Sequence, residues 1–228
     1  MITGKSNRED FFAKTAVVNF DLQTYQNKHL IIINEGKTKT LLKYDNSNKI
    51  EIFVKKTTLG KLRNIALELV PPNAIWTTWD DDDWRCQDYL SILFHALNKN
   101  KSKRYLMYTK RIDHNLNNNF TYEVHIPSGT YIFFCYKDPM LKYDNLDTKE
   151  DAITKQYILG RLEKTLIYEN DATLYIRFVH NNNTSVYVDK FKKCTANYKK
   201  KSSYFEYNAT NLQKQYVNKI KKKYYNNK

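Results

Sequence analysis

Apolar and polar positions follow two different periods along the first hundred residues. The stretch "KHLIIINEG" (28–36) has an unbroken apolar run, which predicts a strand buried on both faces, with a turn at Gly36. Shorter apolar runs predict further strands at 1–6, 49–56 and 74–79. Spacing of three to four residues predicts helices at 7–23, 58–70 and 86–100. This alternation of strand and helix is typical of an α/β layered domain.

Two of these helices have a predicted buried face. In 7–23 the expected face consists of Phe11, Phe12, Thr15, Val18 and Leu22. In 58–70 it consists of Leu62, Ile65, Ala66 and Leu69, and "PPN" ends the helix.

The pattern becomes more strand-like after Asn100. It predicts strands at 103–113 and 128–137 around an Asn-rich turn, and another strand at 172–180. A helix is predicted at 148–163, with Thr148 as its N-cap and Asp151 in its first turn. We expect one domain over residues 1–191, followed by a Lys/Asn/Tyr-rich extension over 192–228.

Composition narrows the class of protein. The chain has 228 residues, of which 41% are hydrophobic, and this supports a packed core. No run of about 18 apolar residues occurs, so no transmembrane helix is expected, and the first ten residues lack the apolar stretch of a signal peptide. The three cysteines are far apart, which fits a reducing compartment and a cytoplasmic location.

The net charge of +14 raises the question of nucleic-acid binding. An abundance of Lys, Asn, Tyr and Ile, the residues of A/T-rich codons, explains the same excess without any such partner. The charge is also uneven, because lysines dominate and acids nearly vanish from Lys190 onward.

The extension has an amphipathic pattern. Apolar residues recur four apart, with lysines between them, at Leu212, Tyr216, Ile220 and Tyr224. This predicts a basic helix that either packs on the domain or lies on an anionic membrane surface.

Four consecutive aspartates follow the predicted strand at 74–79, in "IWTTWDDDDWRCQDYL" (75–90). A solvated acidic loop is the simplest interpretation. However, ligands of open α/β sheets bind beyond the carboxyl ends of the strands, where this cluster lies. Crowded carboxylates need a neutralising cation, and Mg²⁺ or Mn²⁺ shares oxygen ligands between carboxylates and phosphates. The cluster therefore indicates a metal–diphosphate site.

Three further positions carry candidate chemistry. Glu150 and Asp151 lie near a helix start, where they act either on the helix dipole or in a site. His180 ends a strand beside polar residues, as a structural histidine or as a ligand. Arg63 is suited to a phosphate or to a carboxylate.

From Arg8 to about Ser185 the chain resembles the family-2 nucleotide-sugar glycosyltransferases of the GT-A fold. The motifs that carry the resemblance occur in the expected order: "REDFF", "QTYQNKHLIIINEG", "LGKLRNIALEL", "WDDDDW", "ED" and "RFVHNNNTS". The resemblance implies a Rossmann-like three-layer α/β/α sandwich with a mixed, mostly parallel sheet, here followed by the basic helical extension.

The resemblance also implies roles on the donor side. Asp80 would lie near the donor ribose and Asp82 on the metal, with Asp81 and Asp83 in support. Arg63, followed by Asn64, matches the arginine near the nucleotide. His180 matches a position that approaches the metal or the diphosphate. The family usually has an acidic residue after its second strand that reads the base, where this chain has "NEG" and the candidates Asn34 and Glu35.

On the acceptor side, Asp151 matches the catalytic base of the family's "ED" motif, and Glu150 is its neighbour. Ser128, Gly129 and Thr130 fall where the acceptor-facing strand begins.

The implied activity is metal-dependent transfer of a sugar, with inversion, from a nucleotide-diphosphate sugar to a hydroxyl group. A UDP-sugar is the favoured donor and Mn²⁺ or Mg²⁺ the cofactor, and the acceptor is a glycan, a lipid-linked sugar or a protein. Asp151 would remove the hydroxyl proton. No nucleic-acid partner is expected, and the basic tail allows peripheral membrane contact.

Two other functions use the same residues. A metal-dependent phosphoryl-transfer enzyme or nuclease acting on nucleic acid would use the carboxylates with two metals. A non-catalytic binding module on a decayed transferase fold would account for "NEG".

Overall fold

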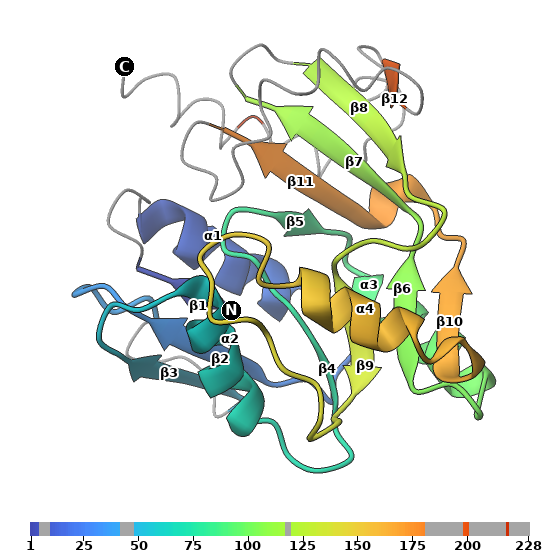
Figure 1. Cartoon of the computed structure of the whole chain (residues 1–228). Helices are drawn as coiled ribbons and strands as arrows, with labels where there is room; N and C mark the ends of the chain where they lie inside the picture. The colour runs from blue at the N-terminus through green and yellow to red at the C-terminus, as the bar shows by residue number, and fades with distance from the viewer. Residues whose placement is uncertain (5–9, 42–47, 117–119, 181–197, 201–217, 219–228) are drawn as a thin grey trace.

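The computed structural model describes residues 1–4, 10–41, 48–116, 120–180, 198–200 and 218. Within them the protein is mixed α/β, with three sheets and four α-helices (Figure 1). The first sheet has the order β1-β2-β3 and is parallel throughout, from β1 (Ile2–Thr3), β2 (Leu30–Asn34) and β3 (Lys49–Phe53). Ile32 and Ile33 of the central strand β2 are both fully buried, which confirms the prediction that this strand is covered on both faces.

The other two sheets are mixed. The second has the order β10-β6-β9-β4, from β10 (Thr165–Tyr168), β6 (Tyr105–Tyr108), β9 (Phe133–Tyr136) and β4 (Ile75–Thr77). The third has the order β12-β8-β7-β11-β5, from β12 (Tyr198–Lys200), β8 (Phe120–His125), β7 (Lys110–Asn115), β11 (Tyr175–Val179) and β5 (Trp84–Arg85). Of the nine strand pairings among the described residues, four are parallel, so the prediction of a mostly parallel sheet was wrong.

The second and third sheets meet at Thr109 and Asn170. The parallel pair β6·β10 ends there, and the parallel pair β7·β11 begins shortly beyond it. Asn170 joins the segment that follows β10 to the segment between β6 and β7. Its Oδ1 accepts from the backbone N–H of Thr109 and Lys110, and its Nδ2 donates to the Lys110 carbonyl. The single strand predicted for 103–113 is therefore two strands in different sheets. The second of these strands, β7, forms a hairpin with β8, a strand that the sequence pattern did not indicate.

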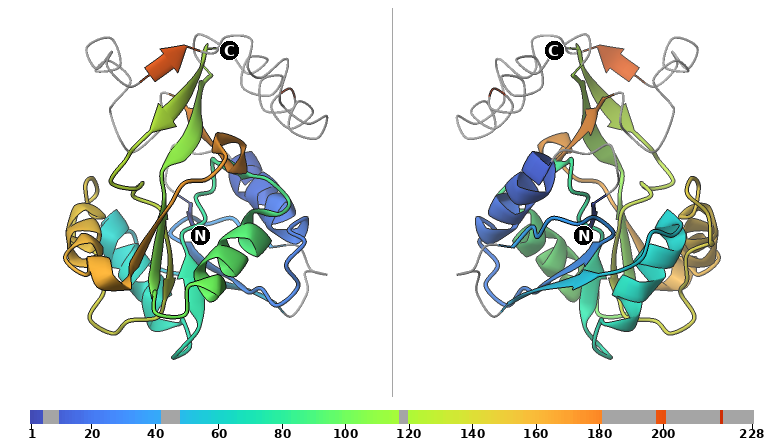
Figure 2. Two further views of the ribbon diagram at one scale, coloured as in Figure 1. Left: turned by 90° about the vertical axis from the view of Figure 1, so that its right-hand side faces the viewer. Right: turned by 90° about the vertical axis from the view of Figure 1, so that its left-hand side faces the viewer.

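The first and second sheets lie between two pairs of helices, and β7 and β8 of the third sheet extend beyond them (Figure 2). On one side α1 (Asp10–Asp21) and α3 (Tyr89–Lys99) share a core with β2 and β6. On the other side α2 (Leu59–Glu68) and α4 (Ala152–Leu159) contribute Leu67 and Ile158 to a core with Trp76, Met107 and Phe133. Short 3₁₀ turns, η1 (Leu162–Lys164) and η2 (Ala172–Leu174), precede β10 and β11.

The buried face of α1 agrees only in part with the predicted one, since Phe12 and Thr15 are buried as predicted. Val18 is 55% exposed and Leu22 is 43% exposed, whereas Ala13, Val17 and Phe20 are buried. Apolar residues occur on more than one side of this helix, so spacing alone did not identify the side that meets α3. In α2, Leu62 is buried as predicted but Leu69, its C-cap, is 40% exposed.

The start of α4 also differs. The predicted helix 148–163 is shorter, and its N-cap is Asp151 rather than Thr148. Lys149 has a φ of 61°, in the left-handed region, so the chain turns between Thr148 and the helix. The predicted tail helix lies outside the described residues, although β12, from the predicted extension, pairs with β8. No helix in the described part of the chain is long and apolar enough to cross a bilayer.

The orientation of α1 predicts opposite effects at neighbouring valines. Val17→Ala should lower the free energy of unfolding by about 1–3 kcal/mol, because it leaves a cavity in the core. Val18→Ala should leave it within about 0.5 kcal/mol of the wild type, since Val18 is exposed and Ala favours helix. Urea unfolding of both variants measures this difference. A larger loss of unfolding free energy in Val18→Ala than in Val17→Ala would contradict the orientation of α1 and support the buried face predicted from spacing.

Candidate functional site

The four aspartates form the turn between β4 and β5, and Asp80, Asp82 and Asp83 contact different partners. Asp81, Asp82 and Asp83 are buried, and Asp80 keeps 32% of its side chain exposed. The segment is therefore not the solvated loop of the simplest interpretation.

Asp80 meets Arg63 and Glu150. The Arg63 Nη2 atom of α2 lies 3.6 Å from Asp80 Oδ1 and 3.3 Å from Glu150 Oε1, and the guanidinium lies 5.2 Å from the centre of the Tyr143 ring. Burial works against the charged guanidinium, but Tyr143 and the neighbouring carboxylates hold the pKa of Arg63 above its ordinary value. Three residues predicted from separate motifs thus converge at one point.

Asn64 and Gly60 hold the loop that carries Tyr143. The Asn64 side chain exchanges two hydrogen bonds of 2.9 Å with the Tyr143 backbone, as donor to its carbonyl and acceptor from its N–H. At Gly60 a Cβ atom would lie 1.6 Å from the carbonyl oxygen of Asp144, so only glycine allows this approach. Asn64, predicted on the donor side, here positions the ring that covers Arg63.

Glu150 and Asp151 lie where this loop enters α4. Burial raises the pKa of Glu150, Arg63 opposes the rise, and Asp151 adds to it. Burial also raises the pKa of Asp151, with Arg63 opposing and Asp80 adding. Asp151 makes no side-chain cap bond to the helix, so its carboxylate is not committed to that role.

Asp82 pairs with His180 at the end of β11. The Asp82 Oδ2 atom lies 3.1 Å from His180 Nε2, both side chains are almost fully buried, and the Phe12 ring stacks on the imidazole with centroids 5.2 Å apart. This distance is that of a hydrogen bond between the two side chains, and it is also close to the roughly 3 Å that separates two ligand atoms bound at about 2.1 Å to one octahedral ion. Within the described residues no three His, Cys, Asp or Glu side chains form a ready metal site. An ion here would take its other ligands from substrate oxygens and water.

Asp83 turns into the protein. The Tyr175 hydroxyl donates to its Oδ2, and the Phe178 N–H lies 3.2 Å from its Oδ1. Burial, and then the charges of Asp82 and Asp80, raise the pKa of Asp83 well above its ordinary value. A protonated Asp83 reduces the repulsion within the cluster.

Arg85 is a buried residue that the sequence analysis missed. Its guanidinium lies over the rings of Trp79, Tyr89 and Tyr175, at 4.3, 5.6 and 5.1 Å, and its Nη2 donates to the Thr78 carbonyl. It supports the aspartate turn from inside the fold. The signal was present in "WRCQDYL", where an arginine stands among aromatic residues directly after four acids.

Lys155 was missed as well. It lies one helical turn after Asp151, and its Nζ donates to the Gly129 carbonyl at 2.6 Å and lies 4.2 Å from the centre of the Tyr131 ring. The ammonium also lies 3.4 Å from Ser128 Oγ. Burial lowers the pKa of Lys155, and Asp151 opposes this. The predicted acceptor segment is therefore joined to the helix that begins at Asp151. The i, i+4 spacing of Asp151 and Lys155 indicates that these two are neighbours on the helix, but it gives no sign of the contact with Gly129.

Gly129 and Thr130 shape that segment. Gly129 has a φ of 82°, and a Cβ atom there would lie 2.6 Å from the Met107 side chain. Thr130 is fully buried and donates to the Ile132 carbonyl, so its hydroxyl faces the interior.

Asn34 and Glu35 lie apart from these groups. The Asn34 amide donates to Glu51 and to the Thr38 carbonyl, and its Oδ1 accepts from the Gly36 N–H. Glu35 Oε2 lies 3.4 Å from the Thr57 N–H. These bonds organise the ends of β2 and β3, and neither residue lines the cavity that reaches Arg63 and Asp80.

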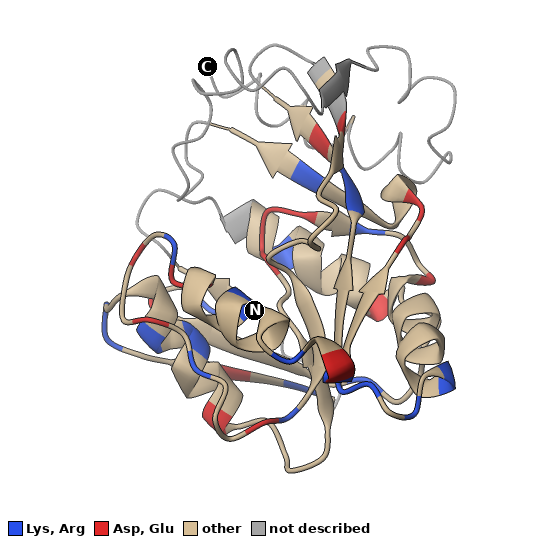
Figure 3. Ribbon diagram, turned by 45° about the vertical axis from the view of Figure 1, so that its right-hand side comes forward, with Lys and Arg blue, Asp and Glu red and all other residues tan. Residues whose placement is uncertain are grey.

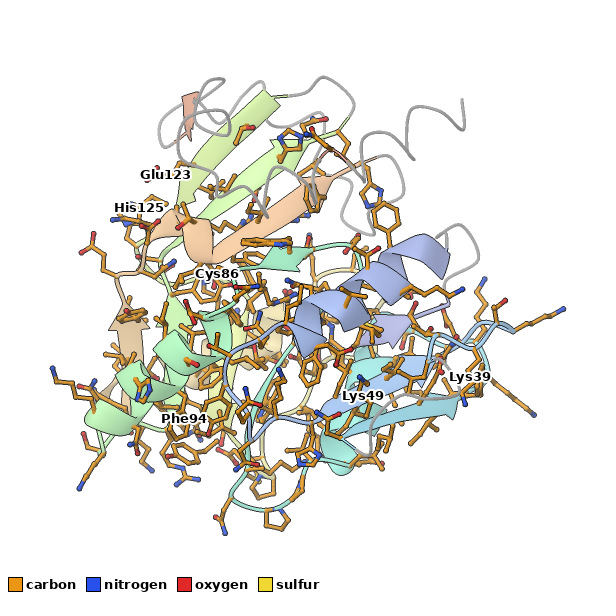
Figure 4. All side chains as sticks on the ribbon, turned by 180° about the vertical axis from the view of Figure 1, so that it is seen from behind. Lys39, Lys49, Cys86, Phe94, Glu123 and His125 are labelled. Carbon is orange, nitrogen blue, oxygen red and sulfur yellow. The ribbon has the colours of Figure 1, made fainter. Side chains whose placement is uncertain are left out.

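That cavity has a volume of about 650 Å³ and lies between the first and second sheets. Arg63 and Asp80 border it, together with apolar residues of β1, β2 and β4. Phe94 of α3, labelled in Figure 4, lines it beside Tyr25, with ring centroids 4.8 Å apart. Its size suits a small-molecule ligand.

A scan against protein-family models and a search of curated proteins gave no match to this chain.

The raised pKa of Glu150 predicts a pH-dependent effect of Glu150→Gln. Above about pH 4.3 the unfolded chain releases this proton before the folded protein does, so wild-type stability falls by up to about 1.4 kcal/mol per pH unit until the raised pKa is passed. Glutamine does not titrate, so the free energy of unfolding of the variant should rise relative to that of the wild type between about pH 4.3 and the raised pKa of Glu150. Below about pH 4.3 the difference between the two proteins should stay constant.

Urea unfolding at a series of pH values from 3.5 to 8 measures the difference. Glu163→Gln, at an exposed position in η1, controls for the loss of one carboxylate. A constant difference between Glu150→Gln and wild type across this range would contradict the prediction.

Proposed function

We propose that this protein is a glycosyltransferase that moves a sugar from a nucleotide-diphosphate sugar, with a UDP-sugar favoured, to an acceptor hydroxyl. The observation that carries the proposal is the Arg63 guanidinium between Asp80 and Glu150. It joins the acidic segment after β4 to the acidic pair before α4, which are the two separated acidic sites that such a reaction uses.

The topology supports a GT-A-type domain. The chain runs outward from β1 to β3 and then enters β4, and both Ile2 of β1 and Ile75 of β4 line the central cavity (Figure 1). Among the described residues β1 and β4 belong to different sheets, so a β3-β2-β1-β4 reversal, the place where open α/β sheets bind nucleotides beyond the carboxyl ends of the strands, is part of the proposal. The aspartate turn follows β4 at that reversal.

Asp82 and His180 are the residues that would hold Mn²⁺ or Mg²⁺, as their spacing allows. When bound, such an ion offsets the charge that develops on a diphosphate leaving group. Arg63, whose pKa is raised, adds a fixed positive charge beside Asp80. Asp80 would meet the donor ribose, and Asp81 would support the turn.

Asp151 would act as general base for the acceptor hydroxyl. Its raised pKa brings it closer to the operating pH, which favours proton transfer. Lys155 joins α4 to Gly129 and so fixes the distance between the base and the acceptor segment. Attack from the face opposite the leaving group would invert the anomeric centre.

The charge distribution favours a transferase over a nuclease. Twelve of the 38 basic residues but only two of the 24 acidic ones follow position 180, so residues 1–180 carry a net charge of only +4. Basic and acidic residues are interspersed over the described ribbon (Figure 3). The basic tail remains the candidate for peripheral membrane contact.

The first test is thermal unfolding with nucleoside diphosphates and nucleotide sugars, each with and without Mn²⁺. A ligand that binds the native state raises the midpoint. We expect a metal-dependent rise with uridine nucleotides that is lost in Asp82→Ala and kept in Glu163→Gln. No rise with any nucleotide would overturn the proposal.

A second test concerns Asp151. With the donor identified above, its hydrolysis by water should fall about 10²–10⁴-fold in Asp151→Asn, while the nucleotide-induced thermal shift is kept. A rate unchanged in this variant would remove Asp151 as the base.

The pH profile of the same reaction tests Lys155. Because the Lys155 charge lowers the pKa of Asp151, Lys155→Met should move the acid limb of the profile to higher pH. Lys142→Met, at an exposed position, is the control. An acid limb that stays in place or moves to lower pH in Lys155→Met would contradict the assignment of Asp151 as the base whose pKa Lys155 lowers.

A further inference from the structure

Two arginines on neighbouring strands of the third sheet face one buried carboxylate. Arg111 and Asp113 lie on the same side of β7, and Arg177 of β11 is the cross-strand neighbour of Asp113. Asp113 receives hydrogen bonds from Arg111 Nε at 2.7 Å and Nη2 at 3.3 Å, whereas Arg177 Nη1 lies 3.9 Å away. Arg111 thus makes the closer contact with Asp113, and Arg177 makes the longer one.

This face adjoins the candidate site at two points. Tyr175 precedes Arg177 by two residues on β11, so it shares the face, and its hydroxyl donates to Asp83 of the aspartate turn. Lys155 of α4 lies near Arg111, whose charge helps to lower the pKa of the lysine. The basic groups therefore extend from β11 to the helix that begins at Asp151.

We propose that Arg111, Arg177 and Lys155 form a subsite for an anionic group of the acceptor, so that the acceptor is a sugar bearing a carboxylate or a phosphate. The inference rests on the proposed function and deepens it. Guanidinium groups bind carboxylates and phosphates through paired hydrogen bonds. The Arg111 and Arg177 side chains are 12% and 21% exposed, so they are shielded from bulk water but reachable.

The position of the cluster assigns it to the acceptor and not to the donor. Lys155 contacts Gly129 and Ser128 of the acceptor segment and lies near Asp151, the proposed base. The donor side has its own guanidinium, that of Arg63 beside Asp80.

Arg177→Gln is the variant that tests the subsite. Asp113 keeps both hydrogen bonds from Arg111 in this variant, so the fold is expected to survive. Arg111→Gln would instead leave Asp113 buried without them. Arg104→Gln is the control, because Arg104 is an exposed arginine that lies over the Tyr136 ring at 4.7 Å.

Dissociation constants of glucuronic acid, glucose 6-phosphate, glucose and inorganic phosphate are measured by ligand-observed NMR, without nucleotide. We expect one or both anionic sugars to bind about tenfold tighter than glucose, and Arg177→Gln but not Arg104→Gln to remove most of that difference. A preference for glucuronic acid identifies a carboxylate, and a preference for glucose 6-phosphate identifies a phosphate.

Equal binding of charged and neutral sugars, or a preference that survives Arg177→Gln, would overturn the inference. Phosphate that binds as tightly as glucose 6-phosphate would overturn recognition of a sugar. A nucleotide-induced thermal shift lost in Arg177→Gln would place the residue on the donor side and also overturn it. If no nucleotide binds but the charged sugars bind through Arg177, the transferase proposal fails and the subsite stands.

Discussion

The guanidinium of Arg63 connects parts of the chain that are distant in sequence, the end of β4 and the start of α4. Taking this cation and the Glu150 carboxylate out of water is costly, and such pairs contribute little net stability compared with apolar residues of the same size. Removing one partner is a different matter, because a buried charge left alone costs about 3–5 kcal/mol. The pair therefore acts mainly as a constraint: the loop with Tyr143, the turn with Asp80 and the start of α4 must assemble around Arg63 together. Asn64 and Gly60, on the same helix, fix the loop by backbone contacts that a larger residue at position 60 would prevent.

The same constraint explains how four successive aspartates are accommodated in a folded protein. Repulsion between the aspartates is lowered because their carboxylates face different neighbouring groups. Asp80 faces Arg63, Asp82 faces His180, and Asp83 is held by Tyr175 where burial favours its protonated form. Arg85 lies behind the turn with its charge against aromatic rings, so a cation supports the cluster from inside without occupying its exposed side. Asp80 keeps the largest exposed fraction of the four, which leaves one carboxylate open to a ligand.

Local sequence was enough to predict those features whose cause is local. The apolar run of β2, the helices and the turn at the end of β4 each follow from a few neighbouring residues. Features set by distant partners could not be obtained this way. The division of 103–113 at Thr109 depends on Asn170, and the buried side of α1 depends on the core that it shares with α3, in which Val17 rather than Val18 is buried. The motif order led us to expect Arg63, Asp80 and Glu150 in one site. Their convergence at the Arg63 guanidinium, the inward bonds of Asn34 and the contact of Lys155 with Gly129 required the fold.

The arrangement of charge around the site has a chemical consequence. The carboxylates of Asp80, Glu150 and Asp151 lie at its centre, with Arg63 between the first two, and the further cations Lys155 and Arg111 lie on the flank beyond Asp151. A centre of this kind suits a cation and a proton acceptor, whereas the cations suit anionic parts of substrates. Fixed charges in a shielded site act more strongly than in water and need no reorganisation when charge moves. A reaction that releases a diphosphate and removes a proton from a hydroxyl places its charges in this pattern, since the leaving group is anionic and the hydroxyl proton must go to a carboxylate. The raised pKa of Asp151 follows from the burial that the same shielding requires.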